Sequence, residues 1–141
     1  MKRSFKYAWR GKKLAVRAER NLRIHLVVFV VALFCAYLGG VEPWGWAAVI
    51  IVSALVICAE MLNSAIERLS DKVEPKIDPV IRDVKDIASG AVLVCAAAAV
   101  LVGCVVFLRF DVLKNLSEHL FELALLAFIA PTLVFMISRR I

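Results

Sequence analysis

Hydrophobic positions along the chain form four long runs, separated by short polar segments, at residues 24–40, 44–66, 88–108 and 119–138. A helix needs about 20 apolar residues to cross the hydrocarbon core of a bilayer, because each residue adds about 1.5 Å. Each run is close to that length. The pattern predicts an all-α integral membrane helical bundle with three to four transmembrane helices. We expect residues 1–141 to form a single membrane domain.

The fourth run is the least regular of the four. It contains Glu122 and Pro131, and the segment before it, residues 110–119, is amphipathic. Two dispositions therefore stay open for residues 119–138, a fourth transmembrane helix or an interfacial helix.

Residues 1–23 show a different pattern, in which a narrow apolar stripe is surrounded by basic side chains. Trp9 and Val16 share this stripe with Phe5. The pattern predicts an N-terminal amphipathic helix that lies flat at the level of the lipid headgroups. Glu19 falls near the apolar stripe, so it either points toward the bundle or is a solvated carboxylate paired with a neighbouring arginine.

Composition and charge support a membrane protein and give its orientation. Of the 141 residues, 62% are hydrophobic, the mean hydropathy is +0.84 and the net charge is +6. Lysine and arginine are concentrated in residues 1–23 and in the connection at 68–86, and none lies in the turn at 39–46. The positive-inside rule places the first two segments in the cytoplasm, with several passes of the chain through the plasma membrane. The basic arm should face anionic lipid headgroups, and nucleic acid is not an expected partner.

Acidic and amide side chains interrupt the second hydrophobic run at helical spacing. Glu60, Asn63 and Glu67 lie on one stripe of a helix, and Asp71 continues it just beyond the run. One ionisable group at the middle of a transmembrane helix costs roughly 2.5–3.5 kcal/mol on insertion scales. A simple anchor would not need this face. We therefore expect it to meet a metal ion or a phosphate-bearing substrate at the membrane boundary.

Further charged groups should reach the same level from other segments. Lys85 and Asp86 stand just before the third run, and Glu19 comes from the surface helix. Carboxylates with a lysine suit a divalent cation and a phosphate, since Mg²⁺ prefers hard oxygen ligands and commonly binds through nucleotide phosphates. Lys85 would neutralise phosphate charge in the transition state. The Gly-rich and catalytic-loop motifs of soluble kinases are not found in the sequence.

Three blocks of the sequence resemble the prokaryotic diacylglycerol kinase family. Residues 60–71 match the pattern E-x-L-N-[ST]-x-x-E-x-x-x-D, and residues 85–92 match K-D-x-x-[AS]-[GA]-A-V. Residues 7–11 and 19–25 are similar to the family's N-terminal block. The likeness covers about residues 5–108, so the fourth hydrophobic run lies outside it.

This resemblance implies a homotrimer of small helical bundles, with active sites shared between subunits. It also implies Mg-ATP-dependent phosphorylation of a lipid primary hydroxyl on the cytoplasmic side of the membrane. Carried over by position, Glu60 would be the catalytic base, and Glu19 and Glu67 would bind the magnesium ion and ATP. Glu60 is also the deepest carboxylate of the stripe and hence the least solvated, as suits a base.

The remaining matched positions would bind nucleotide or support the site. The resemblance implies that Lys85, Asp86 and Tyr7 contact ATP. Asn63 and Asp71 match the signature and would orient the site or the substrate, as would Ser89 in the second block. The pattern of polar residues agrees on which face is functional but does not by itself assign these individual roles.

Two lipid acceptors are reasonable. The run at residues 19–25 resembles the undecaprenol kinase branch more than the diacylglycerol branch. Undecaprenol needs a slot for one chain, whereas diacylglycerol needs room for two. We therefore favour undecaprenol, which would give undecaprenyl phosphate, with diacylglycerol and phosphatidic acid as the alternative.

Two other classes of function are weighed against a kinase. A small proton-coupled multidrug transporter would also carry a membrane glutamate, but its charges should lie at the midplane rather than at one face. A non-catalytic anchor or assembly subunit would not justify the insertion cost of the carboxylate stripe.

Overall fold

The computed structural model describes residues 2–74 and 78–139. Within these ranges the chain forms six helices and no strand. They are α1 (Lys2–Ala18), α2 (Arg20–Leu38), α3 (Pro43–Val73), α4 (Pro79–Phe107), α5 (Phe110–Glu118) and α6 (Leu120–Arg139). The predicted all-α membrane fold is confirmed.

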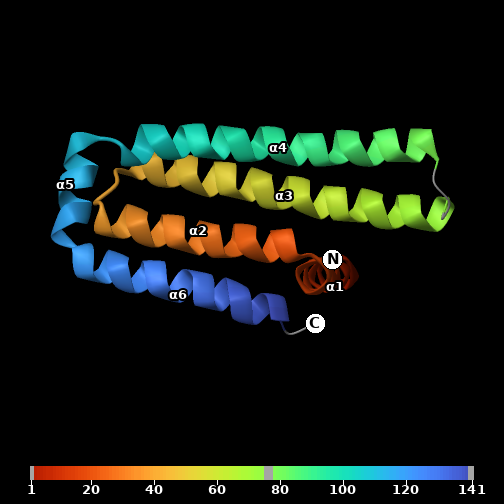
Figure 1. Ribbon diagram of the computed structural model, residues 1–141, viewed down its shortest axis with the longest axis horizontal. Coiled ribbons are helices and arrows are strands. Elements are labelled where there is room, and N and C mark those ends of the chain that lie inside the picture. Colours follow the sequence, from red (N-terminus) through yellow and green to blue (C-terminus); the bar gives the residue numbers. More distant parts are fainter. Residues whose placement is uncertain (1, 75–77, 140–141) are drawn as a thin grey trace.

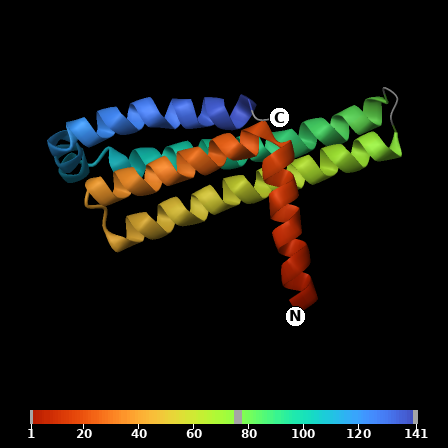
Figure 2. The same ribbon diagram turned by 90° about the horizontal axis from the view of Figure 1, so that it is seen from below.

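Four of the helices run side by side, and two lie across them. Figure 1 shows α2, α3, α4 and α6 in one bundle, with α5 crossing its end. The helix α1 projects away from the bundle, as Figure 2 shows, and is strongly amphipathic as predicted. The helices α3 and α4 extend beyond the ends of α2 and α6 (Figure 1). These overhanging ends carry Asp71 and Lys85 of the predicted site.

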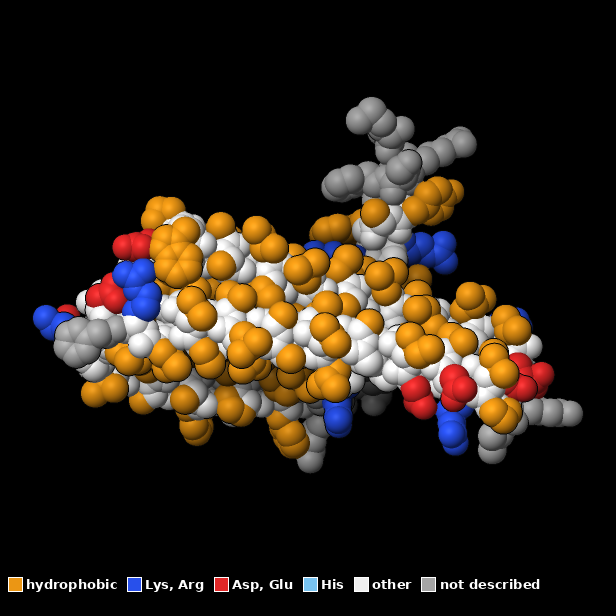
Figure 3. All heavy atoms as spheres, turned by 90° about the horizontal axis from the view of Figure 1, so that it is seen from above, with side chains coloured by type: hydrophobic (Ala, Val, Ile, Leu, Met, Phe, Trp, Pro, Cys, Tyr) orange, Lys and Arg blue, Asp and Glu red, His pale blue; other side chains and the backbone are white. Residues whose placement is uncertain are grey.

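In the part of the chain that the structure describes, three helices are long and apolar enough to cross a membrane, namely α2, α3 and α4. The helices α5 and α6 qualify as a fourth span only as a pair, and they are bent by 82° at the break between them. In Figure 3 hydrophobic side chains cover most of the face that is shown, and the acidic side chains lie toward its two ends. This distribution is the one a lipid-facing bundle requires.

The connection predicted at residues 68–86 is largely helical, so the prediction of a long charged loop there is wrong. The helix α3 continues to Val73 and α4 begins at Pro79; residues 75–77 lie outside the described residues. Asp78 caps α4, because its carboxylate accepts hydrogen bonds from the backbone N–H groups of Val80 (2.8 Å) and Ile81 (3.0 Å). Hydropathy marks only the part of a helix within lipid, and α3 with 31 residues is about 46 Å long.

The opposite end of the bundle holds a small apolar core of Ala36, Val41, Val49, Val106 and Val112. The turn between α2 and α3 is tight, and Gly40 adopts a positive φ of 62° there. Such a backbone conformation strains other residues. Asn115 donates a hydrogen bond to the carbonyl of Gly39 (3.0 Å), which fixes α5 against this turn.

Candidate active site

The polar stripe of α3 is turned into the protein rather than toward lipid. The side chains of Glu60, Asn63 and Ser64 are buried, with exposed fractions of 4%, 9% and 4%. Leu62 and Leu69 on the other face are more than half exposed. Since buried polar groups are costly unless they have partners, the partners of these groups define the site.

Glu60 receives its polar neighbours from the start of α2. The side chain of Asn21 forms a hydrogen bond with Glu60, and the charges of His25, Glu19 and Glu67 also act on it. The chain is extended at Glu19, between α1 and α2, so α1 can turn away while Asn21 and His25 stay beside α3. Glu19 is partly buried and close to Glu60, which favours the first of its two predicted orientations.

One turn further along α3, Asn63 and Glu67 are joined. Asn63 Nδ2 donates a hydrogen bond of 3.0 Å to Glu67 Oε1. The other end of this amide, Asn63 Oδ1, is buried and has no hydrogen-bond partner among the residues that the structure describes. An oxygen left without a partner beside a carboxylate is well suited to a cation.

The donor set fits magnesium only in part. Glu67 and Asn63 Oδ1 both offer hard oxygen atoms, and Mg²⁺ usually takes one or two carboxylates and completes its shell with water and phosphate. Within the described ranges, however, no group of three or more histidine, cysteine, aspartate or glutamate side chains is arranged to hold a metal ion. Nucleotide phosphates would therefore have to supply the remaining ligands.

The overhanging ends of α3 and α4 are bridged by an ion pair. Lys85 Nζ donates to Asp71 Oδ1, and their side chains are 33% and 67% exposed. Ser89 Oγ donates a hydrogen bond of 3.0 Å to the carbonyl of Asp86, whose own side chain is exposed. Lys85 and Asp86 thus stand at the edge of the site, within reach of a soluble nucleotide.

Tyr7 lies apart from the predicted site residues of α3. It is 67% exposed on α1, the helix that projects away from the bundle in Figure 2. The fold therefore pairs Asn63 with Glu67 and Asp71 with Lys85, and it places Glu19 within electrostatic range of Glu60, but it leaves Tyr7 outside these groups.

Two residues of the Glu60 environment were not predicted as site residues, Asn21 and His25. Both lie on α2, four positions apart, and therefore on one helical face. Asn21 and His25 follow Glu19 by two and six residues. This spacing in the sequence is the signal that could have identified them as site residues.

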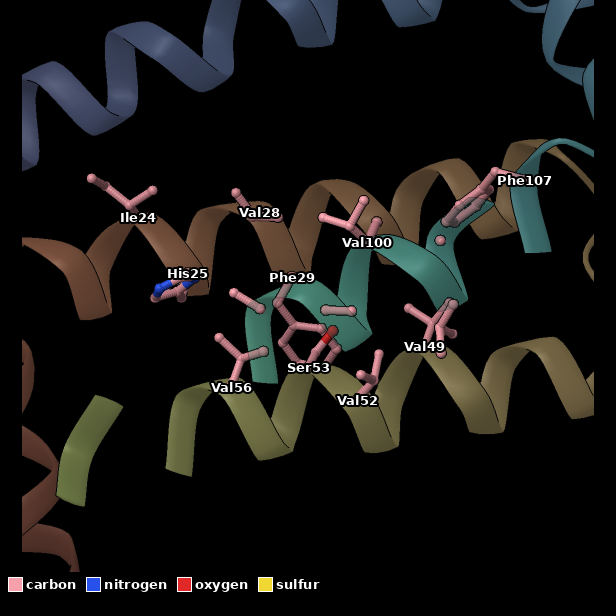
Figure 4. Close-up of a pocket in the computed structure, with 15 residues that line it drawn as sticks. Ile24, His25, Val28, Phe29, Val49, Val52, Ser53, Val56, Val100 and Phe107 are labelled. Carbon is pink, nitrogen blue, oxygen red and sulfur yellow. The ribbon is translucent and has the colours of Figure 1, made fainter. Parts of the chain in front are cut away.

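An apolar groove lies in the membrane-spanning part of the bundle. It has a volume of about 390 Å³ and is bounded by α2, α3 and α4. Its walls are apolar except near His25 and Ser53, and Figure 4 shows His25 at the end where α2 begins. Val56 lines the groove one helical turn before Glu60 on α3. A long apolar chain lying here would place its polar end beside Glu60.

Known proteins similar to this chain are named as kinases of diacylglycerol or undecaprenol. The chain is 40% identical over 101 residues to a diacylglycerol kinase of Synechocystis, which covers 71% of this chain and 58% of that protein. It is 32% identical over 106 residues to the undecaprenol kinase of Bacillus subtilis, covering 75% and 86%. It is 30% identical over 99 residues to the diacylglycerol kinase of Escherichia coli K12, covering 70% and 81%.

The first of these relatives is longer than the matched region, and the chain spans 58% of its length. The sequence pattern of one family, prokaryotic diacylglycerol kinase, matches residues 6–107, which is most of the chain and includes α2, α3, α4 and the buried polar stripe. The chain therefore belongs to the prokaryotic diacylglycerol kinase family.

Proposed function

We propose that this protein is a lipid kinase that transfers the γ-phosphate of ATP to the primary hydroxyl of a membrane lipid. The observation that carries the proposal is the burial of Glu60, one helical turn beyond Val56, which lines the apolar groove. A lipid chain in the groove would present its hydroxyl to this carboxylate. Membership of the kinase family supports the same activity.

Glu60 would act as the general base. It would accept the proton of the lipid hydroxyl as the oxygen attacks the γ-phosphorus, and ADP would leave. Asn21 forms a hydrogen bond with the carboxylate and would hold it in the orientation for this transfer. A base at hydrogen-bond distance from the reacting proton contributes typically 10²–10⁴-fold in rate.

Glu19 and Glu67 would hold a magnesium ion, and Asn63 would orient Glu67 through their 3.0 Å hydrogen bond. When bound, the ion would neutralise charge on the ATP phosphates. Lys85 would contact the phosphates from α4, with Asp71 positioning its ammonium group. Asp86 would contact the nucleotide, and Ser89, bonded to the Asp86 carbonyl, would support that turn of α4.

The site would face the cytoplasm, because the basic segments of the chain lie at the same end as the overhanging parts of α3 and α4. Tyr7 would contact ATP from a different subunit than Lys85 does. The projecting α1 supports an assembly of this kind, in which a homotrimer forms active sites between neighbouring subunits.

Undecaprenol is the acceptor that the groove favours. The groove is one apolar slot between three helices, which suits one linear chain, and the undecaprenol kinase of Bacillus subtilis matches over 86% of its length. Diacylglycerol is the second candidate, since the relative with 40% identity is a diacylglycerol kinase.

The experiment that tests this proposal uses purified protein in detergent or lipid, Mg²⁺ and γ-labelled ATP. Undecaprenol and diacylglycerol are offered separately. We expect label in undecaprenyl phosphate, with less in phosphatidic acid. Label in neither lipid would refute the kinase proposal, and preferential labelling of phosphatidic acid would refute the choice of acceptor.

A further inference from the structure

A second apolar groove lies on the other side of α2. It has a volume of about 280 Å³. Apolar residues of α2 and α6, among them Ala130, line it together with Val16 and Arg23. One wall is therefore α2 and the other is α6. Because α6 begins at Leu120, beyond the last residue of the family match at 107, this wall is an addition to the part that the family shares.

The helix α2 separates this groove from the first one. Its residues at positions 23, 26, 27, 30 and 31 line the second groove, and those at 24, 25, 28, 29 and 32 line the first. At 3.6 residues per turn these two sets occupy opposite faces of the helix. A molecule in the second groove therefore cannot place its polar end beside Glu60, so it would not be the acceptor.

Arg23 makes this groove chemically specific. Its Nε is buried and has no hydrogen-bond partner among the described residues. The guanidinium stays charged, and a buried donor of a charged group is costly when it has no acceptor. No acidic residue is among the described residues that line the groove. An anionic ligand with an apolar chain would satisfy both the guanidinium and the groove walls.

A separate basic hollow lies on α1 and shares one lining residue, Val16, with the groove. The hollow is otherwise formed by Trp9, Lys12, Lys13 and Arg17. The ammonium groups of Lys12 and Lys13 lie 5.7 Å and 5.9 Å from the centre of the Trp9 ring. Tryptophan with lysine and arginine is the combination that proteins place at the level of lipid headgroups.

We infer that an anionic glycerophospholipid of the surrounding membrane binds between α2 and α6 as a non-reacting ligand. Its phosphate would pair with Arg23 beside the basic hollow of α1, and one acyl chain would fill the groove. The lipid would then connect α1, α2 and α6. This inference does not depend on the kinase proposal, because it concerns a site on the opposite face of α2 from Glu60.

Native mass spectrometry of the full-length protein tests this inference. The detergent-purified chain is mixed with phosphatidylglycerol or with phosphatidylcholine of the same acyl chains, and retained lipid is counted per chain. We expect phosphatidylglycerol to be retained preferentially. Arg23→Gln should lower its retention roughly tenfold, which corresponds to a loss of about 1.4 kcal/mol. Arg68→Gln removes a similar charge at an exposed position of α3 and should have no such effect.

A second variant tests the groove rather than the charge. Ala130→Phe fills the wall that α6 provides and should also lower phosphatidylglycerol retention, whereas Ala98→Phe adds the same group at an exposed position of α4 and should not. Equal retention of the two phospholipids would overturn the inference. So would unchanged retention in Ala130→Phe.

Discussion

Lys85 and Asp71 form an ion pair that bridges the overhanging ends of α4 and α3 across 14 positions of sequence. Both side chains are at least a third exposed, and exposed pairs of this kind contribute only about 0–1 kcal/mol to stability. The ion pair is therefore better explained as a contact that positions the Lys85 side chain. It holds the ammonium group at the edge of the site, where the phosphates of ATP are proposed to bind.

Asp71→Asn tests this positioning role. Without the carboxylate, the Lys85 side chain should sample more conformations before ATP binds, which raises the entropy cost of binding. We expect the KM for Mg-ATP to rise about three- to tenfold, as is typical when about 1 kcal/mol is lost. The midpoint of thermal unfolding should change little. Steady-state kinetics would measure the KM, and a melting curve in detergent would measure the midpoint of thermal unfolding.

Asp83→Asn is the matched control, because Asp83 is an exposed carboxylate on the same part of α4. It should leave the KM for Mg-ATP unchanged. A wild-type KM in Asp71→Asn would show that the ion pair has no role in nucleotide binding.

Glu67→Gln should weaken the dependence of activity on magnesium. The amide keeps the shape of the side chain and can still accept the hydrogen bond from Asn63, but it lacks the charge that binds a hard cation. We expect the Mg²⁺ concentration for half-maximal activity to rise at least about tenfold, the change produced by a loss of about 1.4 kcal/mol. Titration of Mg²⁺ at saturating ATP measures this concentration.

Glu118→Gln, a change at an exposed position on α5, is the control and should leave the titration unchanged. A wild-type titration in Glu67→Gln would exclude Glu67 as a metal ligand.

The opposite end of the bundle should be sensitive to acid through Glu42. Hydrogen bonds from Trp44 and Arg109, the latter 3.2 Å long, lower the pKa of Glu42 below its ordinary value of 4.5. A carboxyl group with a lowered pKa stabilises the fold above its ordinary pKa, and this contribution is lost as the pH falls through the lowered value.

Glu42→Gln should therefore have a lower midpoint of thermal unfolding than the wild type at neutral pH, and the two should converge well below pH 4.5. Melting curves over this range measure the difference. Glu118→Gln should follow the wild type throughout. A gap that stays constant down to low pH would mean that the ionised carboxylate is not the stabilising species.

The hydropathy pattern predicts the apolar helices and the inward polar face of α3 well. The stripe of Glu60, Asn63 and Glu67 follows from helical spacing alone, and Glu60 and Asn63 are buried as that argument requires. The amphipathic arm is likewise a helix, and it ends at Ala18 just before the extended residue Glu19. These features depend on local periodicity, which a sequence displays directly.

Features that depend on contacts between helices could not be predicted from the pattern. The hydrogen bond between Asn21 and Glu60 requires the break at Glu19, and no breaking residue such as proline or glycine marks it in the sequence. The helical overhangs at residues 67–73 and 79–87 were hidden because charged residues lower hydropathy without ending a helix. The groove between α2 and α6 exists only because α5 returns the chain across the end of the bundle.

The central claim is that Glu60 accepts the proton of a lipid hydroxyl during phosphoryl transfer. The most direct measurement compares wild-type protein with Glu60→Gln in the same vesicles, following γ-label from ATP into the lipid alongside equilibrium binding of nucleotide. We predict that transfer falls by about 10²–10⁴-fold while nucleotide affinity stays within a few-fold of wild type. Near-normal transfer by Glu60→Gln would contradict the account.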